Sequence, residues 1–353
     1  MEVSQRWLEF INGEKSDRVP CIPHLMGHSA YVMGAPNLGD YYTKPDFCIK
    51  SQMVTRELYR YDQPPQILDP GYLAECWGTT VIQPYNPKMG APAPVDPGIK
   101  TPEQLEKLEV PDPRKVKWAD ELHTMIKIAT DQKQYPIVWF LGGWITGTAG
   151  MMVPLEDFMI WMIEQPDLAK KALALTAEYE LAQIEYFIDE FGNDSWVPCT
   201  ANPTDSNVLI DANMFREFPF PIVKKLNKKV VDMGFRAIWA HWCGDHNQTI
   251  DAGYVHEIPM GENGILHFGP EVTMEKQVEI FGDQFNLFGN VDPPLIMTAE
   301  FDEWMGLCRE NMEAGMKSKK GYALTVGCEM PPPAPFSNVY AMTKAVEQYG
   351  KNK

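Results

Sequence analysis

The sequence predicts an α/β protein that folds as one (β/α)8 TIM barrel over residues 1–353, with a proline-rich insertion in its N-terminal part. Six short apolar segments between residues 135 and 326 have the composition of buried strands, and stretches of helical periodicity separate them. Strands that alternate with helices at this spacing indicate parallel βα units. Because no strand is followed by a Gly-x-Gly-x-x-Gly turn, a barrel is favoured over a doubly wound sheet.

The barrel units come mostly from the second half of the chain, with one or two more before Pro113. We expect strands at 21–24, 135–141, 195–200, 235–239, 264–268, 285–288 and 322–326. We expect helices at 3–11, 46–61, 118–130, 154–164, 166–191, 213–233, 274–281, 299–314 and 339–349. Thr101 and Pro102 have the composition of a helix start. Residues 25–39 are expected to form a loop, and residues 63–113 an irregular insertion with a hairpin at 74–82.

Composition excludes several classes of partner. The chain has 31 basic and 48 acidic residues, a formal charge of −17, so it repels phosphate backbones and acidic membranes and we expect no nucleic-acid binding. No apolar run reaches the ~18 residues of a membrane span. Residues 1–10 lack the apolar core of a secretory signal, which favours a cytoplasmic protein with reduced thiols. The seven cysteines are widely spaced without a Cys-x-x-Cys pair.

Two ends of predicted strands carry soft metal ligands. His241 and Cys243 follow the apolar run 235–239, and two residues apart in an extended chain they project to the same side. Cys328 follows the run 322–326. One histidine and two thiolates form a tetrahedral zinc site with one position open, the pattern of catalytic zinc. The alternative for His241 and Cys243 alone is a buried histidine beside an inert thiol; the third ligand favours zinc.

A closed, structural zinc site would need a fourth ligand from Glu329, Asp245 or His246. Such cages usually lie within one short loop, so the open site is preferred. Two thiolates nearly neutralise the metal. The site therefore suits activation of a thiol or an ether oxygen better than formation of hydroxide.

Further candidates lie at the carboxyl ends of the predicted strands, where barrel enzymes place their active sites. We predict catalytic roles for Asp205, Asp245 and Glu329. We predict substrate-binding roles for His24, His28, Trp144, Asn207, Trp242, Asn290 and Met330. Each has a structural alternative: Asp205 can cap a helix, Asn290 can serve a turn, and His24 and His28 can be satisfied core histidines.

Four motifs together resemble the uroporphyrinogen decarboxylase superfamily. They are Asp17-Arg18-Val19-Pro20, His241-x-Cys243-Gly244, Gly289-Asn290-Val291-Asp292-Pro293 and Gly327-Cys328-x-x-Pro331-Pro332. Within that superfamily they look like the zinc-dependent corrinoid methyltransferase branch. The resemblance covers nearly the whole chain.

The resemblance implies a (β/α)8 barrel, zinc on His241, Cys243 and Cys328, and methyl transfer to or from the cobalt of a separate corrinoid protein. True decarboxylases carry an arginine-rich loop after the first strand, whereas residues 25–31 contain no arginine. Decarboxylation is therefore disfavoured. Asp245-His246-Asn247 and Glu329 resemble bacterial variants that use methylated compounds rather than archaeal coenzyme M methyltransferases.

Three hypotheses remain open. The first is demethylation of a small methylated substrate such as a methoxylated aromatic, which the Trp-rich and Met-rich strand ends favour. The second is methylation of a thiol, such as coenzyme M or homocysteine, from the methylated corrinoid. The third is a zinc scaffold without catalysis. A homodimer is compatible with the sequence.

Overall fold

Seven parallel strands form the centre of the protein, for which the computed structural model describes residues 4–71, 73–141 and 144–351. Their spatial order is β1-β4-β5-β6-β7-β8-β9, so every strand from β4 on pairs with its predecessor in the sheet. The bounds are β1 (Gln66–Leu68), β4 (Ile137–Leu141), β5 (Val197–Ala201), β6 (Trp239–Trp242), β7 (Ile265–Phe268), β8 (Asn286–Val291) and β9 (Tyr322–Val326). Strands β5 to β9 are buried at every position, as expected where helices cover a parallel sheet.

An eighth segment, residues 20–22, lies between β9 and β1. Cys21 forms a parallel bridge with Leu324 of β9, supported by two backbone hydrogen bonds of 2.9 Å. On its other side, the backbone N–H of Asp62 donates to the Cys21 carbonyl at 2.8 Å, shortly before β1. The predicted (β/α)8 barrel is thus confirmed. Where a strand was predicted at 21–24, the structure has a single bridge at Cys21, and the chain leaves extended geometry at His24, with φ +55°.

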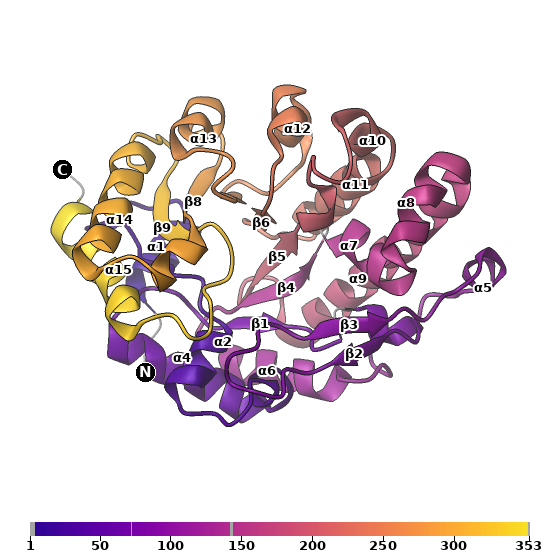
Figure 1. Ribbon diagram of the computed structural model, residues 1–353, viewed down its shortest axis with the longest axis horizontal. Coiled ribbons are helices and arrows are strands. Elements are labelled where there is room, and N and C mark those ends of the chain that lie inside the picture. The colour runs from indigo at the N-terminus through magenta and orange to yellow at the C-terminus, as the bar shows by residue number, and fades with distance from the viewer. Residues whose placement is uncertain (1–3, 72, 142–143, 352–353) are drawn as a thin grey trace.

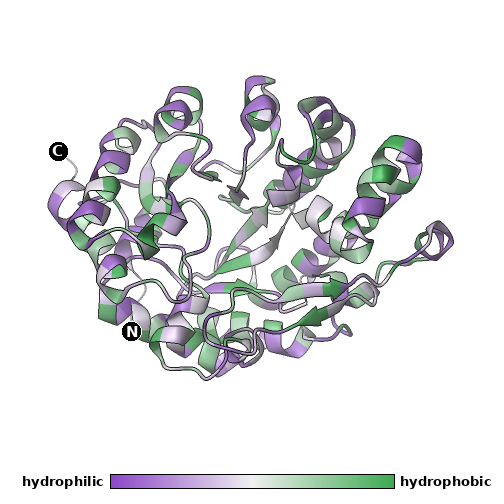
Figure 2. Cartoon of the chain, viewed as in Figure 1, coloured by the Kyte–Doolittle hydropathy of each residue, from purple (hydrophilic) through white to green (hydrophobic). Residues whose placement is uncertain are grey.

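Helices surround the strands, which curve around a common centre (Figure 1). Helix α6 shows why helices pack around the strands. On one face, Leu122, Met125, Ile126 and Ala129 are buried at helical spacing, and the opposite face is polar. Apolar and hydrophilic residues accordingly alternate along the outer helices (Figure 2). The helices are α1 (Gln5–Ile11), α2 (Gly27–Val32), α3 (Gly39–Thr43), α4 (Pro45–Tyr59), α5 (Pro102–Glu106), α6 (Ala119–Asp131), α7 (Trp144–Met152), α8 (Leu155–Glu164), α9 (Pro166–Phe191), α10 (Ala212–Glu217), α11 (Pro219–Asp232), α12 (Asn247–Asp251), α13 (Met274–Phe281), α14 (Phe301–Gly315) and α15 (Phe336–Tyr349).

The inside of the barrel is filled by aromatic rings and histidines. Trp239 of β6 packs against Trp139 of β4 and Phe288 of β8, with ring centroids 5.2 and 4.8 Å apart. Because side chains alternate along a strand, His241 also faces inward, two residues beyond Trp239. Trp242 faces the other way and packs against Phe215 of the helical layer. The space beneath the mouth of the barrel is therefore filled by packed rings.

The insertion between β1 and α6 carries an antiparallel hairpin of β2 (Thr80–Ile82) and β3 (Ala93–Asp96). The predicted hairpin at 74–82 is wrong, because 74–77 form a 3₁₀ turn and only 80–82 are a strand. Gly78, with φ +90°, redirects the chain between them. Thr101 begins α5 as predicted, in a capping box with Gln104.

Two other boundaries differ from the prediction. The helix expected at 213–233 is interrupted at Phe218, because Pro219 lacks the N–H that a continuous helix needs. The strand expected at 235–239 begins only at Trp239 and ends at Trp242. Phe235, Ala237 and Ile238 are buried in the chain that leads into the strand, whereas Arg236 is exposed. His241 therefore lies inside the strand and Cys243 just beyond it.

Several short elements were not expected, namely α2, α3, α7, α12 and β1. The predicted loop 25–39 contains helix α2, and a further helix, α7, follows β4. The three-residue strand β1 lies in the stretch predicted to be irregular, between prolines that hide its apolar pattern. Among the described residues, no helix has both the length and the hydropathy needed to cross a bilayer.

Candidate metal centre

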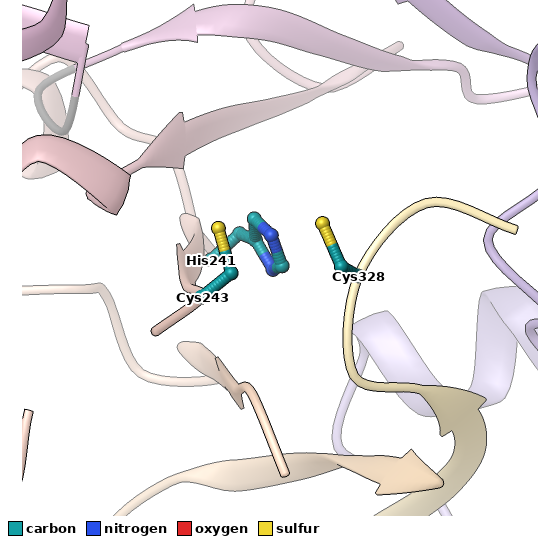
Figure 3. Close-up of side chains that lie close together, drawn as sticks. All are labelled: His241, Cys243 and Cys328. Carbon is teal, nitrogen blue, oxygen red and sulfur yellow. The ribbon is translucent and has the colours of Figure 1, made fainter. Parts of the chain in front are cut away.

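His241, Cys243 and Cys328 meet at the carboxyl end of the barrel. One ligand atom from each lies within 4.8 Å of the others. Figure 3 shows the two sulfur atoms on either side of the His241 ring. His241 and Cys243 come from the end of β6, and Cys328 from the turn after β9, three strands away. In a flat sheet the two strands would be about 14 Å apart, so closure of the barrel brings the thiols together.

The turn after β7 separates and supports the two cysteine loops. A side chain added at Gly327 would come within 2.7 Å of Pro270, and one added at Gly269 within 3.0 Å of the Gly244 nitrogen. Gly244 itself has φ +93°, a conformation that favours glycine. The glycines beside both cysteines thus allow close packing of three loops. This packing sets the distance between the thiols.

The two thiols perturb each other. Hydrogen bonding with Cys243 lowers the pKa of Cys328, whereas the same bond, burial and the neighbouring charge raise the pKa of Cys243. Glu271, on the supporting turn, adds a negative charge that acts on both. Cys328 is therefore the first of the pair to ionise. A cation placed between the thiols would stabilise both as thiolates.

His267 of β7 belongs to the centre and was missed at the sequence level. Its Nδ1 lies 2.9 Å from His241 Nδ1, and its Nε2 lies 2.7 Å from the Val326 carbonyl oxygen. The sequence feature that could have identified His267 is its place as a polar residue inside the apolar segment Ile-Leu-His-Phe. The register that pairs His241 with His267 is visible only in the sheet.

The three predicted catalytic carboxylates have different surroundings. Asp205, in a 3₁₀ turn after β5, is fully buried; it accepts a 2.7 Å hydrogen bond from Asn202, and burial raises its pKa to about 6. Asp245 accepts bonds from the backbone and side chain of Asn247, which lower its pKa. Glu329 accepts a bond from the Gly27 N–H, and burial raises its pKa to about 7.

His24 lies beside the three clustered donors, whereas His28 does not. The His24 ring is 5.6 Å from His241 and 5.0 Å from Trp139. Its Nδ1 bonds to the side-chain oxygen of Gln66 at 2.9 Å, and burial holds its pKa well below the usual range. His28 bonds to the Pro332 carbonyl and the Tyr59 hydroxyl instead. His24 is the better placed of the two to contact a substrate.

The remaining predicted substrate residues bond to neighbouring loops, lie in the core or fall outside the described side chains. Asn207 bonds to backbone and side-chain atoms of Thr249 and so orders the start of α12. Trp242 and Met330 are buried in the core. Trp144 begins α7, and its side chain lies outside the described residues. The substrate-binding roles of these residues stay predictions.

Asn290 holds the turn that supports both cysteine loops. Its side-chain nitrogen donates to the carbonyls of Gly269 at 2.7 Å and Val272 at 2.8 Å. Asn290→Leu is expected to lower the free energy of unfolding by about 1–3 kcal/mol, because it removes two buried hydrogen bonds. Each carbonyl keeps one other donor, the Val272 N–H for Gly269 and the Gln277 amide for Val272. Urea unfolding of the zinc-free protein measures this effect. An unchanged midpoint would mean that water or a rearranged turn replaces the amide.

Asp69 is a further buried carboxyl at a strand end that the sequence did not single out. It follows β1 directly, and its Oδ1 accepts a 2.7 Å hydrogen bond from the Gly71 N–H. Burial raises its pKa to about 6. The feature that could have identified Asp69 is its position at the end of strand β1, but the neighbouring prolines made this strand hard to predict.

Known proteins resemble the chain in sequence and fold. Methylcobamide:CoM methyltransferase MtaA of Methanosarcina barkeri is 25% identical over 218 residues, 61% of this chain and 58% of that protein. A protein of the same name from strain Fusaro is 26% identical over the same length. The chain thus matches 58% of the length of these curated relatives.

The fold and the family agree with each other. A solved structure described as a methyltransferase from Methanosarcina mazei has a TM-score of 0.80 to this chain, covers 99% of both chains and is 24% identical, a likeness of fold. The model of the uroporphyrinogen decarboxylase (URO-D) family matches residues 3–349. Because this match spans nearly the whole sequence, the chain belongs to the uroporphyrinogen decarboxylase (URO-D) family.

Proposed function

We propose that the protein is a zinc-dependent methyltransferase that moves a methyl group between a small substrate and the cobalt of a separate corrinoid protein. The observation that carries the proposal is the cluster of His241, Cys243 and Cys328 at the mouth of the barrel. One imidazole and two thiols are a donor set that fits zinc. Zinc bound there would supply Lewis acidity toward the heteroatom that exchanges the methyl group.

The surroundings support an open rather than a closed site. Only three ligands form the cluster among the described residues. The groups considered as a fourth ligand have other partners: Asp245 bonds to Asn247, His246 Nε2 to the Cys243 carbonyl, and Glu329 to Gly27. A position left open at the carboxyl end of a barrel is where a substrate can bind.

A corrinoid protein is proposed as the partner because both curated relatives are named methylcobamide:CoM methyltransferases. The sequence contains no Asp-x-His-x-x-Gly cobalamin-binding motif. The cobalt therefore comes from a second protein. This protein has to approach the face of the barrel on which the three ligands lie.

Demethylation is the direction that the charges at the centre favour. Glu271 acts on the Cys328 thiol, so the open position lies beside a negative charge. The nearby cation Lys276 already bonds to Asn247 at 2.8 Å and Asp251 at 2.7 Å. A neutral methyl ether suits this setting better than a thiol that carries a sulfonate or carboxylate. The names of the relatives favour the thiol, which is therefore the second candidate.

The bonds balance simply for a methyl ether. The oxygen–methyl bond would break, the methyl group would pass to the partner's cobalt, which supplies an electron pair as Co(I), and the ether oxygen would keep the electron pair of the broken bond and take up a proton. We propose Asp205 as the residue that handles this proton. It is fully buried, and its side chain interacts with Asn202 and Thr146. Asp245 and Glu329 shape the loops beside the ligands.

The test uses zinc-loaded protein with a reduced corrinoid protein and a methoxylated aromatic. We expect the methylated corrinoid to form, and its absorption spectrum measures this. Zinc K-edge absorption identifies the ligands in parallel: one nitrogen and two sulfurs are expected, with an added oxygen when the phenol product binds. A third sulfur on addition of coenzyme M or homocysteine would support the thiol candidate. Absence of zinc would contradict both.

A further inference from the structure

We propose that His267 is a positioning residue that fixes the tautomer of His241 and so directs the Nε2 lone pair of His241 to the metal ion. The inference rests on the zinc centre of the proposed function. It assigns a role to a buried side chain that is not itself a ligand. Ligand histidines usually donate their second ring N–H to a carbonyl or a carboxylate. Here the acceptor is another imidazole.

The directions of the His241–His267 and His267–Val326 hydrogen bonds follow from the acceptor at the end of this series. The Val326 carbonyl oxygen can only accept, so His267 Nε2, 2.7 Å away, carries a proton. His267 is fully buried and its two hydrogen-bond partners are uncharged, so the ring is neutral, because a buried charge without a charged partner is costly. A neutral imidazole has one proton. His267 Nδ1 is therefore an acceptor.

The next step fixes His241. His241 Nδ1 lies 2.9 Å from the bare Nδ1 of His267, so it donates its proton to that atom. His241 is buried as well, which disfavours a charge on this ring. Its Nε2 is then left with a free lone pair. Without His267, either nitrogen of His241 could carry the proton.

His267 also links the two strands that supply the ligands. It lies opposite His241 of β6 in the register of the sheet, and its bond to Val326 reaches β9 two residues before Cys328. Strand β8 lies between β7 and β9, so this bond crosses the inside of the barrel. The same side chain thus connects the histidine side of the centre to the Cys328 side.

The neighbouring His24 does not compete for this role. Its Nδ1 bonds to Gln66 Oε1, which also accepts a 3.0 Å hydrogen bond from the Trp139 indole. His24 contacts His241 and His267 through its ring, with centroids 5.6 and 5.7 Å away. The His241–His267–Val326 chain is therefore a separate, directional set of bonds.

Two substitutions separate tautomer control from packing. His267→Gln retains an acceptor and a donor about as far apart as the two ring nitrogens, whereas His267→Leu fills the space without either. We expect His267→Leu to raise the zinc dissociation constant by ~10–100-fold, the usual effect of losing a hydrogen-bond partner of a ligand. We expect His267→Gln to recover most of that loss. Competition with a chromophoric chelator measures both values.

The tautomer is read directly in the zinc-free protein. The chain has seven histidines, and ¹⁵N-histidine labelling with the His241→Gln variant assigns the His241 signals by NMR. We expect a protonated Nδ1 and a bare Nε2 on His241 in the wild type and in His267→Gln, and a changed pattern in His267→Leu. His256→Leu, which removes an exposed bond to Gln284, is the control that leaves both readouts unchanged.

The outcomes separate this inference from the proposed function. Wild-type protein that holds zinc through His241, combined with unchanged zinc affinity in His267→Leu, would overturn the role of His267 alone. A proton on His241 Nε2 in the zinc-free wild type would do the same, even if His267→Leu does not fold. Wild-type protein that binds no zinc would instead overturn the proposed function, and the role of His267 with it.

Discussion

Replacing Cys243 or Cys328 with alanine is expected to remove zinc and to lower the rate of methyl transfer by ~10³-fold or more, since Lewis-acid stabilisation is worth several kcal/mol. Either change leaves two of the three donors that lie within 4.8 Å of one another. Two donors hold zinc too weakly to survive dialysis against a chelator. Metal analysis after dialysis, together with the corrinoid methylation assay, measures both losses.

A buried cysteine elsewhere provides the matched control. Cys308 on α14 is fully buried, so Cys308→Ala also removes a core thiol, yet it should keep both zinc and activity. Near-UV circular dichroism shows whether each variant retains its packed core. Full methyl transfer by zinc-free Cys243→Ala protein would refute the catalytic role of the metal and leave a zinc scaffold as the explanation.

Asp205→Asn is expected to stabilise the protein at pH 7.5 while it lowers activity. Burial raises the pKa of Asp205 to about 6 from 3.8, so the folded state disfavours the carboxylate. A raised pKa contributes stability that is complete below pH 3.8 and is lost as the pH rises through about 6. The uncharged amide avoids this loss and should add up to about 3 kcal/mol to the free energy of unfolding at pH 7.5.

The activity of the same variant should fall by ~10²–10⁴-fold, the usual contribution of a positioned acid or base. Urea unfolding at pH 7.5 and pH 4 tests the stability effect, which should vanish at the lower pH. Asp189→Asn, at an exposed carboxylate paired with Arg114 at 3.7 Å, should change neither quantity appreciably. A variant that is less stable at pH 7.5 would show that Asp205 is held as a carboxylate by its neighbours.

Local patterns predicted much of the fold because strand burial and helix periodicity are properties of neighbouring residues. The runs 264–268 and 322–326 became β7 and β9, and Pro166–Phe191 is a helix with the predicted bounds. Strand β6 was misplaced because apolar residues mark burial and not ladder pairing. Strand β1 and helix α7 were missed because short elements next to prolines and glycines carry little periodicity.

The ligand set was also predictable, since the spacing of His241 and Cys243 and the placement of Cys328 after a strand are visible in the chain. The roles of the other residues at strand ends could not be predicted from the sequence. Asn290 supports a turn through two carbonyls, and Asn207 orders the start of α12, contacts that depend on loops from other strands. His267 has no neighbour in sequence that reveals its role.

The sequence by itself determined the alternation of strands and helices, the acidic surface and the identity of three soft donors, because these depend on composition and on short spacings. Only the tertiary structure decided that Cys328 lies beside Cys243, that Asp205 is buried and that His267 joins His241 to Val326. These contacts depend on closure of the barrel and on the register between strands. The distance between the two thiols, the burial of Asp205 and the direction of the His241–His267 hydrogen bond are set by segments far apart in the chain.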